Sequence, residues 1–182
     1  MSSKYKIKDQ TKLYFVSVSV VNWLDVFIRN EYKEILLDSL RYCQTTKGLE
    51  IYAWCIMTSH VHLIIGTSGN KMEDILRDFK SFTSGSLKNA IREHPTESRK
   101  EWLIWMMERA GKKNSNNTGY QFWQQGNHPI ELWDNYMVEQ KLEYLHANPV
   151  VAGFVDVPEA YLYSSARDYS GGKGLLEIKH IQ

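Results

Sequence analysis

Short runs of alternating apolar and polar residues predict three strands in the first third of the chain. The run from Leu13 to Val21 alternates and is rich in β-branched and aromatic residues, which is typical of a strand. Two further runs, Leu49 to Met57 and His60 to Thr67, are separated only by Thr58 and Ser59, a gap short enough for a hairpin. The second and third strands are therefore expected to be neighbours.

Apolar residues at helical spacing predict two helices among these strands. The first begins at Asn30, a residue type that often caps helices, and ends at Gly48. The second begins at Met72 and has to end before Pro95, because proline cannot continue a helix.

The second half of the chain has weaker patterns. A short helix is predicted around 100–109, followed by a polar tract over 111–119 that reads as a mobile loop. A fourth strand is expected somewhere in 120–133. A last helix is predicted from Asp134, its N-cap, to about Ala147, because residues that precede a proline avoid helical geometry.

This order of elements predicts an α+β fold of the ferredoxin-like, split βαβ type. In that fold an antiparallel sheet carries its helices on one face, and the last helix would then lie across the other face. We expect one domain over 1–170, with 95–118 as an insertion, and a loosely held tail over 171–182.

Composition supports one compact domain. The chain has 182 residues, of which 43% are hydrophobic and 24% charged, so it can bury a substantial core. No apolar run reaches the roughly 18 residues of a membrane span, and the first residues lack the apolar stretch of a signal peptide, so a cytoplasmic protein without a membrane partner is expected. The two cysteines, Cys43 and Cys55, are expected to be buried free thiols.

The net charge of +1 argues against a protein that coats nucleic acid through bulk electrostatics. The charges are nevertheless unevenly distributed: the first dozen residues are basic, whereas 131–168 are acidic. Any site for a polyanion must therefore be local.

The triplet His60, Val61 and His62 is the first candidate for chemistry. Side chains alternate along a strand, so both imidazoles should lie on one face of the sheet while Val61 faces the helices. Two such histidines can chelate one metal ion. Imidazole suits Mn²⁺ or Zn²⁺, and Mg²⁺ is possible where phosphate and water complete its shell. A merely polar sheet face would give the same pattern.

The last helix supplies a second candidate. Tyr144 and Asn148 are four residues apart and therefore share a helical face. If that face lies over the sheet, Asn148 could offer an oxygen to the metal and Tyr144 would be a nearby nucleophile. His146, two residues from the tyrosine, should lie on a different face. Ordinary packing followed by a cap is the alternative explanation.

Several segments in this order resemble a known family. They are HVH in a strand, FWQQ at 122–125, YLHANPVVAGFV from the last helix onwards, and PEAYLYSSARDY near the end. Over about residues 12–170 the chain is similar to the single-tyrosine HUH transposases, specifically the branch of REP-associated tyrosine transposases.

The resemblance implies the same split βαβ fold and a set of roles. His60, His62 and Asn148 would bind a divalent metal ion, Mg²⁺ or Mn²⁺, and Tyr144 would attack DNA. The enzyme would cleave and rejoin single-stranded or hairpin DNA through a 5′-phosphotyrosine intermediate. A homodimer and a monomer are both compatible with the resemblance.

The chain departs from the family pattern in two places. Family members often have an arginine where this chain has Val151, so a phosphate contact there is in doubt. The 95–118 segment looks like an insertion, either a DNA-binding element or a decoration.

For DNA contact the sequence suggests the polar side of the second helix, where Lys80, Arg77 and Ser84 lie, and the N-terminal lysines at positions 4, 6, 8 and 12. Trp123 and Trp133 are candidates for stacking on unpaired bases.

Two other functions fit the same fold. One is a non-catalytic module that stacks single-stranded nucleic acid on its open sheet face; against it, the third strand offers histidines there rather than aromatic residues. The other is a metal-dependent hydrolase that uses an activated water, without a covalent intermediate.

Overall fold

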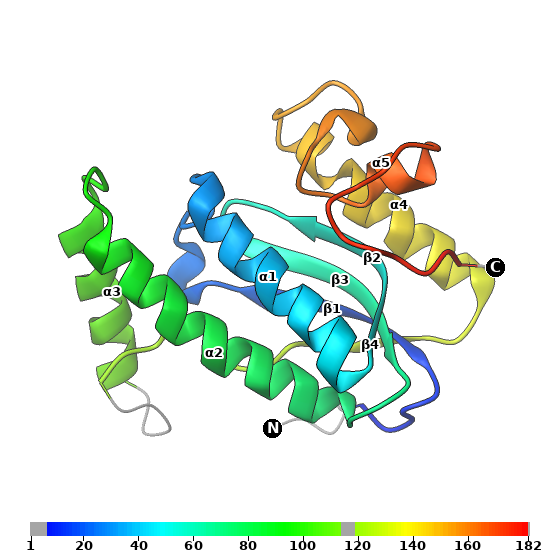
Figure 1. Cartoon of the computed structure of the whole chain (residues 1–182), viewed down its shortest axis with the longest axis horizontal. Coiled ribbons are helices and arrows are strands. Elements are labelled where there is room, and N and C mark those ends of the chain that lie inside the picture. Colours follow the sequence, from blue (N-terminus) through cyan, green and yellow to red (C-terminus); the bar gives the residue numbers. More distant parts are fainter. Residues whose placement is uncertain (1–6, 114–118, 182) are drawn as a thin grey trace.

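A four-stranded antiparallel sheet forms the centre of the computed structural model, which describes residues 7–113 and 119–181 (Figure 1). Its strand order is β2-β3-β1-β4. The strands are β1 (Leu13–Ser19), β2 (Leu49–Ile56), β3 (His60–Thr67) and β4 (Ile130–Leu132). Strand β3 lies between β1 and β2 and is antiparallel to both. This is the predicted split βαβ arrangement, and the α+β fold class is confirmed.

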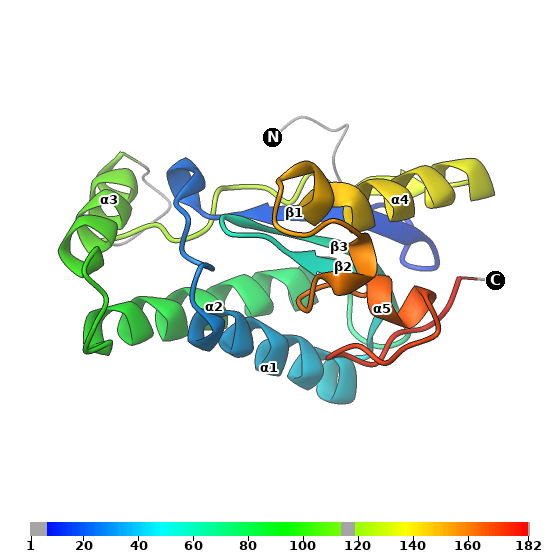
Figure 2. The same ribbon diagram turned by 90° about the horizontal axis from the view of Figure 1, so that it is seen from above.

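Helices cover both faces of the sheet (Figure 2). Helices α1 (Asn30–Lys47) and α2 (Met72–Glu93) lie on one face, and α4 (Asn135–Val151) crosses the other. Helix α3 (Lys100–Lys112) lies beyond one end of the sheet. The short helical turns are η2 (Val21–Trp23), η3 (Pro158–Ala160) and α5 (Ala166–Tyr169). The sheet is thus the middle layer of three.

Successive side chains of strand β3 point to opposite faces of the sheet. Val61, Leu63 and Ile65 are fully buried in the core shared with α1 and α2, as expected. Ile64 belongs to the smaller cluster beneath α4. The intervening histidines therefore face α4.

The first helix ends where the sequence predicts. Gly48 follows it with φ of 74°, and its N–H donates to the carbonyl of Cys43. A β-carbon at Gly48 would lie 2.7 Å from backbone atoms of Gly69, so both the left-handed conformation and the close approach call for glycine here.

The last helix is longer than predicted. The Asp134 side chain caps it by accepting from the N–H of Met137 at 2.7 Å, as expected. However, the helix continues to Val151 with Pro149 inside it. The predicted end at Ala147 is therefore wrong: the pre-proline preference is a bias, and here the helix tolerates one missing donor and still makes the Asn148 carbonyl bond to the N–H of Ala152.

The remaining boundaries shift slightly. Strand β1 ends at Ser19 rather than Val21, although Val20 still forms a bridge with Trp123. The fourth strand lies within the expected range, and α3 runs three residues past the predicted Arg109. The predicted loop over 111–119 includes residues 114–118, which lie outside the described residues.

The C-terminal segment contradicts the expectation of a loosely held tail. Its backbone carbonyls at Leu175 and Glu177 accept hydrogen bonds from two side chains of α1, and Leu176 is buried. The N–H of Lys179 donates to the carbonyl of Ile51 at 2.8 Å. Residues up to 181 therefore cover the edge strand β2, whose backbone groups would otherwise lack partners.

Two expectations from composition concern the cysteines and the membrane. Cys43 and Cys55 are free and buried, as predicted. In the part of the chain that the structure describes, no helix combines the length and apolarity needed to cross a bilayer.

Candidate active site

The two histidines of β3 lie together on the α4 face of the sheet. The ring centroids of His60 and His62 are 4.6 Å apart. His62 is 5% exposed, because its neighbours across the sheet, Ser17 on β1 and Cys55 on β2, are flanked by the apolar residues beneath α4. Alternation along the strand thus puts two imidazoles side by side at a buried position.

Helix α4 places Tyr144 over these histidines. The Tyr144 ring centroid is 5.4 Å from that of His62 and 6.0 Å from that of Phe15, and Phe15 stacks on His62 at 5.3 Å. Tyr144 is half exposed, so its ring contacts the buried histidine while part of it stays accessible from solvent. The structure therefore brings the predicted nucleophile together with the two predicted histidine ligands.

Among the described residues, neither ring nitrogen of His62 has a hydrogen-bond partner, although both are buried. Buried polar atoms are normally bonded, and a bound ion is one explanation for such an exception. Burial, with smaller contributions from His60 and Lys141, lowers the pKa of His62 to about 3. The imidazole is neutral at physiological pH, which is the form that binds metals.

His60 is partly oriented by its surroundings. Its Nδ1 lies 3.2 Å from the hydroxyl of Ser59. Burial lowers the pKa of His60 as well, and the nearby carboxylate of Asp25 opposes that shift. Asp25 itself accepts a hydrogen bond from the Thr58 hydroxyl at 2.6 Å. Both histidines are thus held in the neutral state.

Asn148 lies one helical turn after Tyr144 on α4. Its carboxamide nitrogen donates to the Tyr144 carbonyl at 3.1 Å, which leaves the carboxamide oxygen, the atom that can bind a metal, outside that bond. Among the described residues, no group of three histidine, cysteine or carboxylate side chains could hold an ion. The donors that the structure brings together here are two imidazoles, and the amide oxygen of Asn148 stays a predicted third ligand.

Lys141 belongs to the same site, although the sequence reasoning did not single it out. Its ammonium lies 5.6 Å from the centre of the Tyr144 ring and 5.3 Å from that of Phe15. Lys141 is three residues before Tyr144, so helical spacing alone could have found it. Phe15 could not be found in that way, because its place depends on the pairing of β1 with β3.

His146 lies on another face of α4, as the spacing predicts. It is buried, its Nε2 is 2.8 Å from the Ser165 hydroxyl, and its ring contacts Tyr169. His146 therefore attaches α4 to the C-terminal segment instead of facing Tyr144.

Four of the residues predicted to contact DNA line one groove of about 530 Å³ between α2 and the 120–125 segment: Arg77, Lys80, Ser84 and Trp123. The Lys80 ammonium donates to the carbonyls of Gln124 and Gly126 and to the Asn127 side chain. Burial lowers the pKa of Lys80 to about 8. The Lys80 ammonium therefore holds the loop over 124–127 in place and does not point towards solvent.

The other members of this set have partners too. Arg77 pairs with Asp74 and Asp78 on its own helix, and the Ser84 hydroxyl lies 3.3 Å from that of Tyr120. Of the N-terminal lysines, Lys8 and Lys12 are exposed, while positions 4 and 6 lie outside the described residues.

The expectation that Trp123 stacks on bases is corrected by its burial. Trp123 is 5% exposed, packs against Phe27 and Phe122, and donates its indole N–H to the Thr83 hydroxyl at 3.0 Å. It is a core residue, because the chain around it continues the sheet beside Val20. Trp133, in contrast, is 70% exposed. The departure at Val151 lies at the end of α4, where the side chain is 86% exposed.

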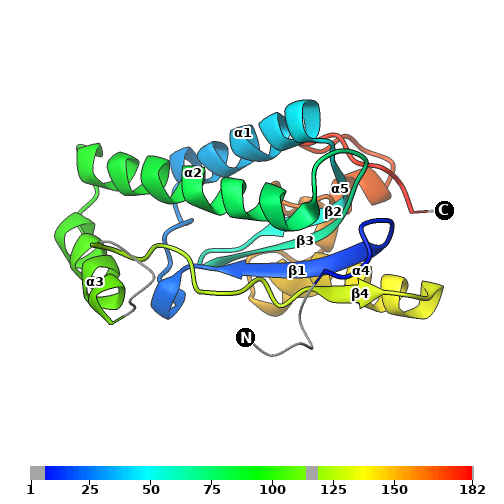
Figure 3. The same ribbon diagram turned by 90° about the horizontal axis from the view of Figure 1, so that it is seen from below.

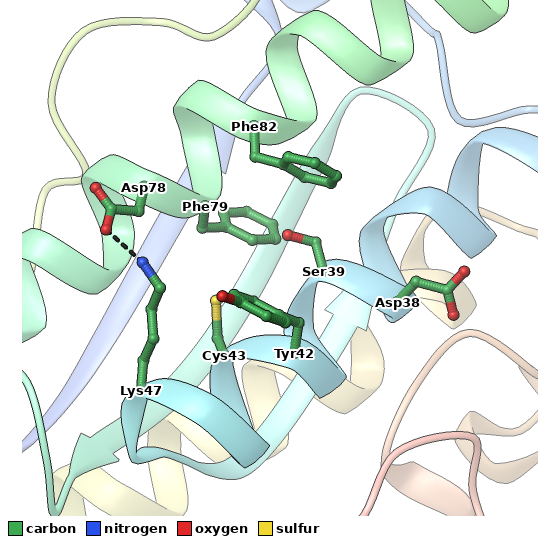
Figure 4. A pocket seen from close by; sticks show the side chains of 8 residues that line it. All are labelled: Asp38, Ser39, Tyr42, Cys43, Lys47, Asp78, Phe79 and Phe82. Carbon is green, nitrogen blue, oxygen red and sulfur yellow. Dashed lines mark hydrogen bonds and ion pairs between the residues drawn. The ribbon is translucent and has the colours of Figure 1, made fainter.

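A separate cavity of about 460 Å³ lies between α1 and α2 (Figure 4). Tyr42 and Phe82 are exposed beside it, and Lys47 pairs with Asp78 at one end. Because both helices lie on the other face of the sheet, this cavity is remote from the histidines.

Two of three comparisons with known proteins found a match. The family model described as "Transposase IS200 like" matches residues 9–140, a range that includes both histidines and ends before Tyr144. A solved structure of a REP-associated tyrosine transposase bound to a REP hairpin has a TM-score of 0.66 and 15% identity, with 100% of this chain and 94% of that chain covered. No curated protein matches the sequence at a significant level. The family match spans well over half of the chain, and the chain therefore belongs to the IS200-like transposase family.

Proposed function

We propose that this transposase is a metal-dependent endonuclease that cleaves and rejoins single-stranded DNA through a 5′-phosphotyrosine intermediate on Tyr144. The observation that carries the proposal is the half-exposed Tyr144 phenol beside His62, a buried imidazole without a hydrogen-bond partner. A hydroxyl nucleophile next to neutral imidazoles that can bind a metal ion is the arrangement that phosphoryl transfer needs.

His60, His62 and Asn148 would hold the divalent ion, Mg²⁺ or Mn²⁺. When bound, such an ion neutralises charge on the non-bridging oxygens of the scissile phosphate. The chain's contribution is the donor set: burial keeps His62 neutral, since its pKa is near 3, and Phe15 fixes the ring by stacking on it. Side chains that are already ordered bind without a further loss of rotamer entropy.

Tyr144 would carry the covalent step. Its phenolic oxygen forms a bond to phosphorus while the bond from phosphorus to the 3′ oxygen breaks, and the proton lost by the phenol is taken up, through water, by the leaving 3′ oxygen. The product is a 5′-phosphotyrosine and a free 3′-OH. A second 3′-OH can reverse the step and join strands without ATP, because the phosphotyrosine keeps the energy of the original bond.

Lys141 would assist electrostatically. Its ammonium lies within 6 Å of the Tyr144 and Phe15 ring centres, and its charge acts on His62. A cation at that distance attracts the phosphate and stabilises negative charge that develops on its oxygens.

The DNA partner is supported by the fold neighbour, which is bound to a REP hairpin. For this chain we propose single-stranded or hairpin DNA. Arg77 and Ser84 are the proposed contacts in the groove between α2 and 120–125, with Lys80 and Trp123 shaping it from inside.

The alternative of a sheet face that stacks nucleic acid is not favoured. Helix α4 packs on that face, and Leu145 and Val138 are buried against Ala53 and Ile64. Such a module needs an open face with aromatic residues.

The test is an SDS-stable adduct. The protein is incubated with a labelled DNA hairpin that carries unpaired flanks, with Mg²⁺ or Mn²⁺, and analysed on a denaturing gel. Tyr144→Phe removes the attacking oxygen and keeps the ring, so the adduct should vanish completely while the melting temperature stays the same.

Tyr136→Phe is the matched control, since Tyr136 is an exposed tyrosine of the same helix, and its adduct should form at the wild-type level. An adduct with Tyr144→Phe would contradict the assignment. Cleavage by the wild type without any adduct would instead indicate the metal-dependent hydrolase.

A further inference from the structure

The turn η2 presents an exposed tryptophan beside the histidines. Trp23 is 56% exposed, and its ring centroid is 5.3 Å from that of His60. Both Asn22 and Trp23 have positive φ, 54° and 55°, although neither is glycine. Two consecutive residues in this strained region are unusual, and an exposed large aromatic side chain gains little from burial there. The strain therefore is not explained by packing of the Trp23 side chain.

A groove of about 610 Å³ begins at this turn and lies between η2, the C-terminal half of α3 and the 121–125 segment. In Figure 3, α3 and the blue turn before α1 stand side by side, and the yellow-green chain passes between α3 and β1. Three backbone bonds fix the walls: Val21 N–H to the Phe122 carbonyl at 2.7 Å, Gln124 N–H to Ser19 at 2.8 Å, and Gln121 N–H to Met107 at 2.9 Å.

The polar residues that line this groove are of two kinds. Asn22, Gln121 and Gln125 carry carboxamides, and Arg109 and Lys113 carry positive charges. No carboxylate is among the described residues that line it. Carboxamides can both donate to and accept from base edges, while cations attract phosphates. The lining thus has the chemistry of a nucleotide site.

We infer that this groove holds the unpaired nucleotides next to the scissile phosphate and that Trp23 stacks on the base nearest the histidines. That the bound DNA strand runs from this groove towards His60 rests on the proposed function. Stacking needs an unpaired base, because a duplex hides the faces of its bases. Trp23 in the η2 turn would therefore provide the stacking surface for an unpaired base, and Arg109 of α3 and Lys113 would attract the phosphates of the same nucleotides.

The experiment measures binding without chemistry. A fluorescent DNA hairpin with an unpaired flank is titrated with protein in EDTA, and anisotropy gives the dissociation constant. Trp23→Ala should weaken binding roughly 5- to 100-fold, the usual effect of losing one stacking platform. Trp102→Ala is the matched control: Trp102 is a comparably exposed tryptophan that does not line this groove, and its loss should change affinity less than twofold.

Two further measurements separate stacking from folding. A blunt hairpin without the flank should bind wild type and Trp23→Ala equally. Gln125→Ala, an exposed change on the opposite wall, should also weaken binding of the flanked hairpin only. The inference is overturned if Trp23→Ala binds the flanked hairpin within twofold of wild type, if it weakens binding of the blunt hairpin equally, or if Trp102→Ala causes the same loss of affinity.

The outcome is independent of the adduct assay. If wild type forms no adduct but the flank-dependent loss appears, the groove stands and the proposed function fails. If the adduct forms and Trp23→Ala binds normally, the proposed function stands and the groove assignment fails.

Discussion

On the α1–α2 side of the molecule the buried carboxylate of Glu97 is fully bonded, whereas on the α4 side the buried imidazole of His62 has no partner. Glu97, whose side chain is 1% exposed, accepts from Arg29 at 2.9 Å and from Arg99 at 3.1 Å, and the Tyr32 hydroxyl lies 3.4 Å away. His62 is similarly buried, and neither of its nitrogens is bonded within the chain.

The difference separates a structural polar group from one that awaits a ligand. Burying a polar group without a partner costs free energy. Three residues donate hydrogen bonds to Glu97, whereas both imidazole nitrogens of His62 carry that cost among the described residues. A bound ion would offset it. On the α1–α2 side the buried polar group therefore stabilises the fold, whereas on the α4 side the unbonded His62 lowers the free energy of unfolding in the absence of an ion.

The largest effect is expected from two neighbours on β3 that face opposite ways. His62→Leu should lower the rate of adduct formation by at least two orders of magnitude, because a metal ligand is lost, while stability in EDTA is unchanged or higher because an unbonded polar group is removed. Leu63→Ala should instead lower the free energy of unfolding by about 2–5 kcal/mol and leave the chemistry of the folded fraction intact. Adduct gels and urea unfolding measure both. If His62→Leu lowers the free energy of unfolding as much as Leu63→Ala does, His62 is a structural residue and the distinction between the two sides is wrong.

Much of this site could be predicted because it depends on local periodicity. A period of two puts His60 and His62 on one face, and a period of 3.6 puts Tyr144 and Asn148 on one face. The fold class then brings the helix across the sheet. These steps need only spacing and element order, so the approach of Tyr144 to the two histidines was predictable from the sequence. The roles of nucleophile and metal ligands came from the family resemblance and stay predictions.

What the sequence did not predict depends on contacts between distant segments. Trp123 is buried because its segment pairs beside Val20, and Lys80 turns inward because a loop 44 residues later offers it acceptors. Phe15 joins the site through strand pairing. Spacing within one element carries no information about such partners.

A moderate effect on the rate of adduct formation is expected at Lys141. Its replacement tests whether positive charge on the α4 side of the sheet contributes to the reaction. Lys141→Gln should slow adduct formation about 10- to 100-fold, since one positive charge near the phosphate is lost. Lys141→Arg keeps the charge and should restore most of the rate. The defect should shrink at high salt, where the charge is already screened. A wild-type rate for Lys141→Gln would show that the ammonium plays no part.

The smallest effect on chemistry is expected at Glu97, the bonded member of the opening pair. Burial favours the neutral carboxyl, but hydrogen bonds from Arg99 and Arg29 outweigh it and lower the pKa of Glu97 to about 2 from an ordinary 4.5. The unfolded chain therefore binds this proton more readily than the folded one, so the stabilisation is complete above about pH 4.5 and is lost as pH falls towards 2. Glu97→Gln should cost about 1–3 kcal/mol of unfolding free energy at pH 7, less at pH 3, with adduct formation unchanged.

Glu101→Gln, an exposed change in the first turn of α3, is the control and should be neutral. If the difference in unfolding free energy between wild type and Glu97→Gln grows on acidification, the expected direction of the pH dependence is wrong. If Glu97→Gln loses adduct formation at unchanged stability, Glu97 acts in the active site and is not only a structural residue.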